Sequence, residues 1–368
     1  MSSMEDTSND EMTGQAVMGR DPPDVAASLE VVRYEPLNTE SPTTALAAPT
    51  TATTHTYIRS NFKAPQLDSS AHRIVLPGAI RGRGFLSMED LAQLPQRTVV
   101  STMECAGNDR TGIKPLPAGE PWKGGAVSTT RWTGVPLHHV LEAFELNGNS
   151  VEVLAIGADS GTPTDATANV TFARSIPMHV ASSSDTLLAL TMNDEPLPAQ
   201  HGGPVRLVVP GWYGMASVKW VSQIEVLTGA YGGYFQSQRY VYDDDDGIRP
   251  VTCMRVKSLI AGPSDGSVLQ AGDVQVWGWA WSGEGMILGV EISISGEGPW
   301  YAASLEAPES SHAWWRWEAS VPLRVPGRHV LRSRARDTTG AIQPYSPLWN
   351  RLGYGNNAIT QVTVCVKR

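Results

Sequence analysis

The alternation of apolar and polar positions changes character about two thirds of the way along the chain. From about residue 56 to residue 228, short apolar runs are separated by turns rich in glycine and proline, which predicts short strands joined by many loops. Two helices are expected, at residues 87–94, where Ser87 can cap an acidic first turn, and at residues 136–144, which are amphipathic. Strands are expected at residues 73–76, 98–103, 151–156, 205–209 and 224–227.

Beyond residue 246 the pattern is that of strands alone. Apolar and polar residues alternate with period two in residues 274–281 and 290–294, and residues 315–321 and 329–335 look similar. Turn residues separate these runs at a spacing typical of a β-sandwich. Eight of the twelve tryptophans lie here. Such a row could stack on a sugar, but in a small sandwich it more often fills the core and an interface.

Three stretches that lack both patterns set the expected domain limits. Residues 1–28 are polar and predict a mobile tail, and residues 38–56 are rich in Thr, Ala and Pro and predict an extended crossing segment. Four aspartates at residues 243–246 predict a solvated loop. We therefore expect a mixed α+β domain over residues 29–245 and an all-β domain over residues 246–368.

Length and charge narrow the functional classes. The chain has 368 residues, which is more than one ordinary core holds, so two domains are natural. Its formal charge of −9 argues against a nucleic-acid partner, which needs a basic face. A pocket can still carry a local field of the opposite sign and bind an anion. No run of about 18 apolar residues occurs, so no membrane span is expected.

The three cysteines indicate a reducing compartment. Cys105, Cys253 and Cys365 are too few and too far apart for a zinc site or a disulfide framework. The first ten residues are acidic and polar, without the basic stretch and apolar core of an export signal. We therefore expect a cytoplasmic protein, or a periplasmic one if the chain is a processed form.

Cys105 has the most informative surroundings of the three. It follows an expected buried strand and begins a turn of small residues, with Arg110 five positions later. Small residues let a large ligand approach the backbone, an arginine can meet an anion, and a thiolate is a soft ligand for a redox-active metal. The alternative is an inert buried thiol, because free cysteine is among the most buried residue types.

Ordered motifs give this cysteine a more specific meaning. The chain resembles the sulfite oxidase family of molybdopterin enzymes over about residues 30–368. The resemblance rests on residues 105–110 (Cys-Ala-Gly-Asn-Asp-Arg), 122–135, 201–206 (His-Gly-Gly-Pro-Val-Arg), 214–220 and 349–357. It implies an α+β molybdopterin-binding domain of the sulfite oxidase type, followed by an immunoglobulin-like β-sandwich that mediates a homodimer.

The resemblance also implies a cofactor and the residues that hold it. The family binds one molybdenum through a pterin dithiolene and one cysteine thiolate, and Cys105 falls at the thiolate position. Asn61 stands near the place of a histidine that often contacts the cofactor in the family. The residues implied to bind the cofactor are Arg59, Asn61, Cys105, Asp159, His201, Arg206, Ser217 and Lys219.

A second set of residues is implied for a small oxyanion substrate. Arg59 and Arg110 match anion-binding arginines of the family, Trp122 matches a tryptophan of the pocket, and Tyr240 matches the active-site tyrosine. Bidentate arginine suits an oxyanion well. Asp109 departs from the family, which often has another arginine there. We expect this aspartate to add negative charge near the pocket mouth, which would suit a less anionic substrate.

Three functions follow from these observations. The first is molybdenum-dependent oxidation of sulfite to sulfate, with electrons passed to an external acceptor, a cytochrome or oxygen, because the chain has no Cys-x-x-Cys-His haem motif. The second is a molybdopterin reductase acting on an S-oxide, an N-oxide or nitrate. The third is not enzymatic: a β-sandwich binding protein that uses its tryptophans.

Overall fold

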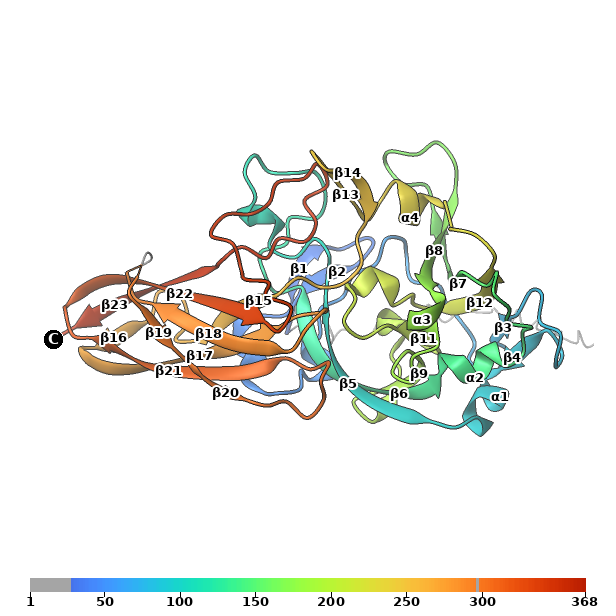
Figure 1. The fold of residues 1–368 in the computed structure, drawn as a ribbon, viewed down its shortest axis with the longest axis horizontal. Coiled ribbons are helices and arrows are strands. Elements are labelled where there is room, and N and C mark those ends of the chain that lie inside the picture. The colour runs from blue at the N-terminus through green and yellow to red at the C-terminus, as the bar shows by residue number, and fades with distance from the viewer. Residues whose placement is uncertain (1–27, 296–297) are drawn as a thin grey trace, which may run out of the picture.

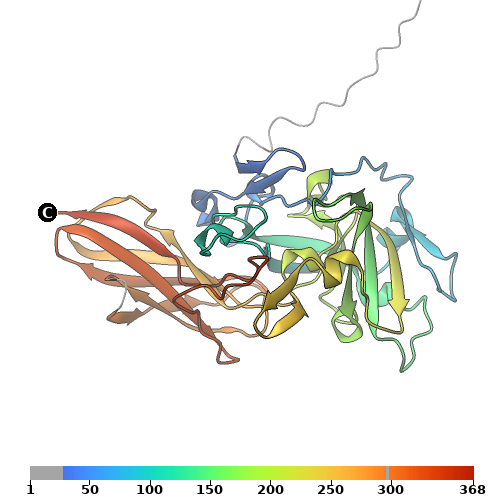
Figure 2. The ribbon, with the colours of Figure 1, turned by 90° about the horizontal axis from the view of Figure 1, so that it is seen from above.

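The computed structural model describes residues 28–295 and 298–368, and the predicted tail lies outside these residues apart from Ser28. Two bodies rich in β-structure lie side by side along the long axis of the molecule (Figure 1, Figure 2). The first body carries the chain up to a hairpin of β13 (Val241–Asp244) and β14 (Gly247–Pro250), and the second body follows. The aspartate run forms the tip of this hairpin. The domain limit at residues 245 and 246 stays a prediction.

The first domain contains two five-stranded sheets. In one, β10, β9, β6 and β5 are neighbours in that order and β11 also pairs with β9; in the other the order is β4, β3, β12, β7 and β8. The bounds of the first are β5 (Arg97–Glu104), β6 (Val127–Pro136), β9 (Leu187–Met192), β10 (Glu195–Pro196) and β11 (Arg206–Val208). Those of the second are β3 (Arg73–Val75), β4 (Phe85–Ser87), β7 (Glu152–Gly161), β8 (Val170–Pro177) and β12 (Val221–Leu227). Each strand predicted from the sequence is present.

Helices are short throughout the described residues. The predicted capped helix forms as α1 (Met88–Gln93), with Ser87 and Asp90 exchanging the two hydrogen bonds of a capping box. The second predicted helix is reduced to α2 (Leu137–Leu141), and α3 (Met178–Ala181) and α4 (Tyr234–Ser237) are single turns. The first domain is therefore mostly β with few, short helices, and the α+β detail of the prediction is not confirmed. No helix of the described part is long and apolar enough to cross a membrane.

The segment at residues 38–56 is more structured than predicted. Its start, β2 (Asn38–Glu40), pairs with β1 (Glu30–Arg33), and two 3₁₀ turns follow, η1 (Thr43–Ala47) and η2 (Thr53–His55). Three further 3₁₀ turns lie near the site described below: η3 (Arg110–Gly112), η4 (Ala199–His201) and η5 (Gly214–Ala216). Glu40 is buried, and three consecutive amides, those of residues 123–125, satisfy its carboxylate by donating to Oε1 at 2.8–2.9 Å.

The second domain is a β-sandwich, as the period-two pattern predicted. Its sheets have the strand orders β15-β17-β21-β20 and β16-β23-β22-β18-β19, and apolar residues of both sheets form one core. The first sheet consists of β15 (Lys257–Gly262), β17 (Gly272–Trp281), β20 (Ser304–Glu306) and β21 (Trp315–Leu323). The second consists of β16 (Val268–Gln270), β18 (Ile287–Ser293), β19 (Trp300–Ala302), β22 (Gly327–Asp337) and β23 (Gln361–Lys367).

Tryptophans of the second domain fill the junction with the first. Trp279 stacks on Trp314 with ring centroids 4.8 Å apart, and both belong to a core cluster that extends through the first domain. Their indole N–H groups donate across the junction, Trp279 to the Leu46 carbonyl at 2.6 Å and Trp314 to the Pro49 carbonyl at 2.7 Å. This confirms the core-and-interface interpretation of the tryptophans and removes the basis for a sugar-binding row.

Candidate active site

Cys105 directly follows β5, at the point where the strand gives way to a tight turn. Its amide donates to the Ala126 carbonyl at 2.8 Å, and its carbonyl accepts from the Asn108 amide at 2.9 Å. The Asn108 side chain closes the turn, because it accepts from the Ala126 amide and donates to Glu104. The thiol is 6% exposed and lies between an inner and an outer cavity. Burial raises its pKa, while Arg59 and Arg110 act in the opposite direction.

The glycines after Cys105 make room for Arg110, where the sequence suggested room for a ligand. A Cβ on Gly107 would lie 2.4 Å from a guanidinium nitrogen of Arg110, and a Cβ on Gly119 would lie 3.0 Å from the guanidinium carbon. Gly119 also has a φ of +124°, which favours glycine. The small residues of this loop therefore permit a buried arginine in the wall of the site.

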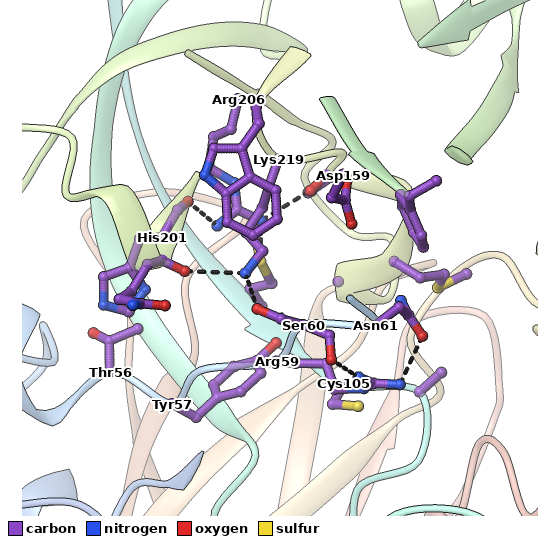
Figure 3. Close-up of a pocket in the computed structure, with 18 of the residues that line it drawn as sticks. Thr56, Tyr57, Arg59, Ser60, Asn61, Cys105, Asp159, His201, Arg206 and Lys219 are labelled. Carbon is purple, nitrogen blue, oxygen red and sulfur yellow. Dashed lines mark hydrogen bonds between the residues drawn. The ribbon is translucent and has the colours of Figure 1, made fainter. Parts of the chain in front are cut away.

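The inner cavity is bordered by buried polar atoms that have no partner within the described residues. These atoms are Asp159 Oδ1, His201 Nε2 and Arg206 Nε, and they come from β7, η4 and β11 (Figure 3). Buried polar groups are nearly always hydrogen-bonded, so three such atoms at one cavity indicate a polar ligand. The polar ring atoms and phosphate of a molybdopterin would satisfy them, and the thiol of Cys105 at the same cavity would meet its metal.

The charges of the inner cavity also indicate a polar ligand, and specifically an anionic one. Lys219 donates to Ser60 Oγ at 2.7 Å and to the Gln200 carbonyl at 3.0 Å, and its pKa lies well below the usual range because of burial and the neighbouring Arg206. Burial also lowers the pKa of Arg206 to about 10 and raises that of Asp159 to about 6. Cations thus outnumber the carboxylate, and an anionic ligand would stabilise them.

Two further residues of the inner cavity have well-defined roles in its wall. Burial, with Lys219 and Arg206 nearby, lowers the pKa of His201 to about 3, so its imidazole is neutral. Arg206 donates to the carbonyls of His201 and Ser217, both at 2.9 Å, and the Ser217 hydroxyl accepts from the Val209 amide at 3.0 Å. These bonds hold His201 and Ser217 in place and leave His201 Nε2 and the Ser217 hydroxyl proton available to a ligand.

The outer cavity has a volume of about 730 Å³ and contains the residues predicted to meet the substrate. Arg59 donates to Asn61 Oδ1 at 2.7 Å, and Asn61 Nδ2 donates to the Tyr240 hydroxyl at 3.1 Å. Asn61 thereby orients both neighbours, and it lines both cavities. Tyr240 has a φ of +49°, a strained value for a bulky residue and one that is typically retained at functional sites.

Arg110 forms the wall of the outer cavity and is more tightly held than a free anion receptor would be. Its guanidinium donates to the Glu120 carbonyl at 2.7 Å and to the Leu352 carbonyl at 3.1 and 3.3 Å, and it lies over the Tyr354 ring. Tyr354 in turn stacks on Tyr240 with centroids 5.2 Å apart. Trp122 is 1% exposed and packs in one apolar cluster with Cys105.

Asp109 does not act as expected. Its carboxylate is directed into the domain junction, 2.5 Å from the Nζ of Lys257, and it does not border either cavity. The expectation of added negative charge at the pocket mouth was therefore wrong, because a buried lysine of the second domain neutralises this aspartate. Asp109 adopts a φ of +58°, which Asp tolerates better than most residues.

The structure brings together all the residues that the sequence implicated. Arg59, Asn61, Cys105 and Tyr240 border both cavities; Asp159, His201, Arg206, Ser217 and Lys219 border the inner one, and Arg110 and Trp122 the outer one. Their individual roles stay predictions. Sequence reasoning missed Tyr57, which borders the inner cavity, Tyr354, which stacks on Tyr240, and Lys257, which pairs with Asp109. Tyr57 stands two residues before Arg59 and Tyr354 lies within the motif at residues 349–357, which were usable signals, whereas Lys257 reaches the Cys105 turn from a distant segment.

Comparison with known proteins supports this picture over most of the chain. Residues 61–235 match the oxidoreductase molybdopterin binding domain, and residues 249–367 match the Mo-co oxidoreductase dimerisation domain. Mitochondrial sulfite oxidase of Mus musculus is 32% identical over 335 residues, which cover 84% of this chain and 60% of that protein. Sulfite oxidase of Arabidopsis thaliana is 30% identical, covering 90% of this chain and 92% of that protein. The chain thus spans about 60% of the length of the mouse relative.

A solved structure extends the similarity to the whole fold. The sulfane dehydrogenase SoxCD from Paracoccus pantotrophus superposes with a TM-score of 0.78 at 27% identity, covering 95% of this chain and 92% of that chain. The two matched domains and the site in the first of them define a molybdopterin-dependent oxidoreductase with a dimerisation domain. Within that class, the chain belongs to the sulfite oxidase family, whose cofactor is molybdenum bound to molybdopterin.

Proposed function

We propose that this protein oxidises sulfite to sulfate and passes the electrons to an external acceptor. The observation that carries the proposal is the arrangement of Arg59, Arg110 and Tyr240 around the outer cavity, which Cys105 also borders. Two guanidinium groups and a phenol form a cationic, hydrogen-bonding surface that suits a small oxyanion.

The inner cavity is where the cofactor would be held. Cys105 would provide the protein ligand to molybdenum, and Arg206 and Lys219 would offset the negative charge of the pterin phosphate. Asp159, His201 and Ser217 would bond the polar ring atoms. The bound cofactor supplies oxygen-atom transfer and accepts the two electrons released as sulfite becomes sulfate.

The chain's own residues would bind and orient the substrate. Arg59 would bond sulfite oxygens, held in place by Asn61, while Arg110 adds positive charge from a fixed position in the wall. The Tyr240 hydroxyl would donate a hydrogen bond toward the reacting oxygen, and buried Trp122 would exclude water beside the thiol. Such preorganised donors act strongly in a site that excludes bulk water.

Sulfite-dependent reduction of ferricyanide by molybdenum-loaded protein tests the proposal. Arg59→Met should raise the KM for sulfite about 10- to 100-fold, because a charge-assisted hydrogen bond to the anion is lost. Arg324→Gln is a matched control, since Arg324 forms an exposed ion pair with Asp273 in the second domain. A fully loaded wild-type protein that leaves ferricyanide oxidised would refute sulfite as the substrate.

We also propose an external electron acceptor and a homodimer. The match of residues 249–367 to a dimerisation domain supports the homodimer. Light scattering on the purified protein tests the homodimer, and a monomer would contradict it. The acceptor would be identified by comparing cytochrome c, ferricyanide and oxygen in the same assay.

A second candidate is oxidation of a sulfane sulfur on a larger molecule. The outer cavity, at about 730 Å³, lies in the size range of pockets for larger molecules and exceeds what one sulfite needs. The similar fold of a sulfane dehydrogenase adds support. Competing sulfite with a thiol persulfide in the same assay separates the two substrates. The reductase alternative loses the support of Asp109, because Lys257 neutralises that residue. It stays a prediction, since NADH nitrate reductase of Hordeum vulgare is 29% identical to this chain and the match covers 98% of it.

A further inference from the structure

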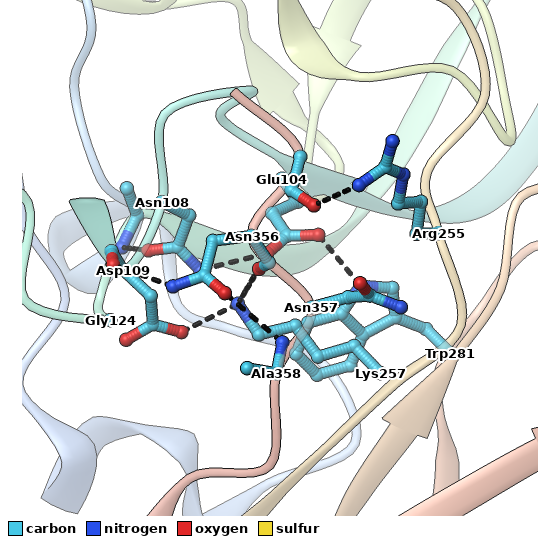
Figure 4. Close-up of polar contacts among 12 residues, drawn as sticks. Glu104, Asn108, Asp109, Gly124, Arg255, Lys257, Trp281, Asn356, Asn357 and Ala358 are labelled. Atoms are coloured by element: carbon cyan, nitrogen blue, oxygen red, sulfur yellow. Dashed lines mark hydrogen bonds and ion pairs between the residues drawn. The ribbon is translucent and has the colours of Figure 1, made fainter. Parts of the chain in front are cut away.

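Three charged side chains from distant parts of the sequence meet at the domain junction, behind the Cys105 turn. Lys257, the first residue of β15, lies between Glu104 and Asp109 (Figure 4). Its Nζ is 3.0 Å from Glu104 Oε1 and 2.5 Å from Asp109 Oδ2, and it also donates to the Asn356 carbonyl at 3.0 Å. All three of its protons therefore have acceptors.

Removing the charges of this cluster from water costs free energy, which their mutual contacts have to offset. The side chains of Lys257 and Glu104 are 2% and 1% exposed. Although burial lowers the pKa of Lys257, the charges of Asp109 and Glu104 outweigh that effect and raise it. A buried ion pair holds only when its geometry is good and the remaining donors and acceptors are satisfied. Glu104 meets this condition, since Asn108 donates to it at 2.9 Å and the Trp281 indole at 3.0 Å.

The second domain also holds the backbone on both sides of the cysteine. The Gly355 amide donates to the Ala106 carbonyl at 2.7 Å, and the Asn356 side chain donates to the Asp109 carbonyl at 2.8 Å. Together with the Lys257 contacts, these bonds restrain the positions immediately before Cys105, immediately after it, and four residues after it. The partners all lie in the second domain, between residues 257 and 356.

We propose that Lys257 is a positioning residue for the metal-binding thiol, so that the second domain completes the cofactor site as well as serving dimerisation. The proposal rests on Cys105 as the molybdenum ligand and is independent of which substrate is used. A ligand that must present its sulfur in one geometry needs a fixed turn, and partners outside the ligand shell commonly provide this rigidity.

The first test measures the alkylation of Cys105 by iodoacetamide in the full-length cofactor-free protein, resolved by peptide mass spectrometry. Asp109→Asn keeps the shape of the side chain and removes its charge, leaving Lys257 balanced by Glu104 alone. We expect Cys105 to react about tenfold faster, because a charge-assisted hydrogen bond that opposes local opening is weakened. Lys257→Met should give a larger increase, and if it does not fold, Asp109→Asn decides.

Two controls separate positioning from general loosening. Cys253, half-buried and outside the cluster, should keep its wild-type rate in every variant. Glu309→Gln breaks another contact between the domains, the ion pair of Glu309 with Arg131 at 2.9 Å, in the middle of the β5–β6 pair. It should leave Cys105 unchanged. The proposal is overturned if the alkylation rate of Cys253 rises in parallel with that of Cys105. It is also overturned if Asp109→Asn folds and its Cys105 reacts at the wild-type rate.

The second test uses the holoenzyme and needs no substrate. The electron paramagnetic resonance signal of singly reduced molybdenum depends on how the cysteine sulfur is oriented at the metal. After chemical reduction, Asp109→Asn should shift its g values, whereas Glu309→Gln should reproduce the wild-type signal. Identical g values in Asp109→Asn and wild type would refute the proposal. Because neither test uses sulfite, a failed sulfite assay would leave both results interpretable.

Discussion

On the side of the Cys105 turn that faces the inner cavity, Arg206 and Lys219 are buried with a single carboxylate, Asp159, and several polar atoms have no partner within the described residues. On the side that faces the second domain, Lys257 has two carboxylates and a carbonyl within hydrogen-bonding distance. Each side contains a buried lysine. Two carboxylates compensate the charge of Lys257, whereas Lys219 and Arg206 share a single carboxylate. The difference separates residues placed to meet an anionic ligand from residues that stabilise the packing of the two domains.

The largest effect is expected from replacing Cys105, which lies between these two sides. Cys105→Ser should keep the fold, because serine is nearly isosteric, and should lose more than about 100-fold in activity. Replacing residues that only support a metal ligand already costs about 10- to 100-fold, and this change removes the ligand itself. Circular dichroism and the sulfite assay measure the two effects, with Cys253→Ser as the active control. Activity at the wild-type level would exclude Cys105 as the ligand.

Lys257→Met should show how much the compensated side contributes to stability. Removing the cation leaves Glu104 and Asp109 buried without their partner, which costs about 3–5 kcal/mol in comparable buried pairs. Urea unfolding of the cofactor-free protein measures the loss. A change below about 1 kcal/mol would mean that the carboxylates are neutralised in some other way.

Lys219→Met is the matched change on the uncompensated side, and it should have the opposite sign. Burial and Arg206 disfavour its charge, so we expect a neutral side chain to stabilise the cofactor-free protein. The same variant should retain less molybdenum after purification, because a cation that would meet the cofactor is gone. Destabilisation comparable to that of Lys257→Met would show that the two sides do not differ.

Asp159 offers a smaller, pH-dependent test. Its pKa in the fold, about 6, lies above the ordinary value of 3.8. Its contribution to stability is therefore complete below pH 3.8 and is lost as the pH rises through 6. Cofactor-free wild type should lose stability relative to Asp159→Asn over this interval, by about 1.4 kcal/mol for each unit by which the pKa is raised. Melting temperatures of the two proteins that change in parallel between pH 4 and pH 7 would contradict this.

The sequence predicted those parts of the fold whose signals are local. The capping box at Ser87 and Asp90 lies within four residues, and the alternation in β17 and β21 is visible along each strand. Helix at residues 136–144 was overestimated because the amphipathic pattern does not reveal that packing allows only α2 to form. Propensity is a weak guide when tertiary contacts decide.

The candidate site was predicted by resemblance, and its limits have a physical cause. Motifs name residues that meet a shared cofactor, so Cys105, His201 and Arg206 fell at one cavity. Motifs do not show which charged residue forms an ion pair with a residue from a distant part of the sequence. Asp109 and Lys257 are 148 positions apart in the numbering and interact only because the domains pack together. Arg110 was read as a free receptor because its carbonyl partners, at Glu120 and Leu352, leave no trace in a motif.

The contacts of Gly355 and Asn356 with the Cys105 turn have a consequence for the order of events during biosynthesis. A ribosome releases the cysteine long before it releases the residues that fix the cysteine's turn. Insertion of the cofactor into a rigid site must therefore follow completion of the polypeptide, and a nascent chain arrested between the two segments would bind molybdopterin weakly.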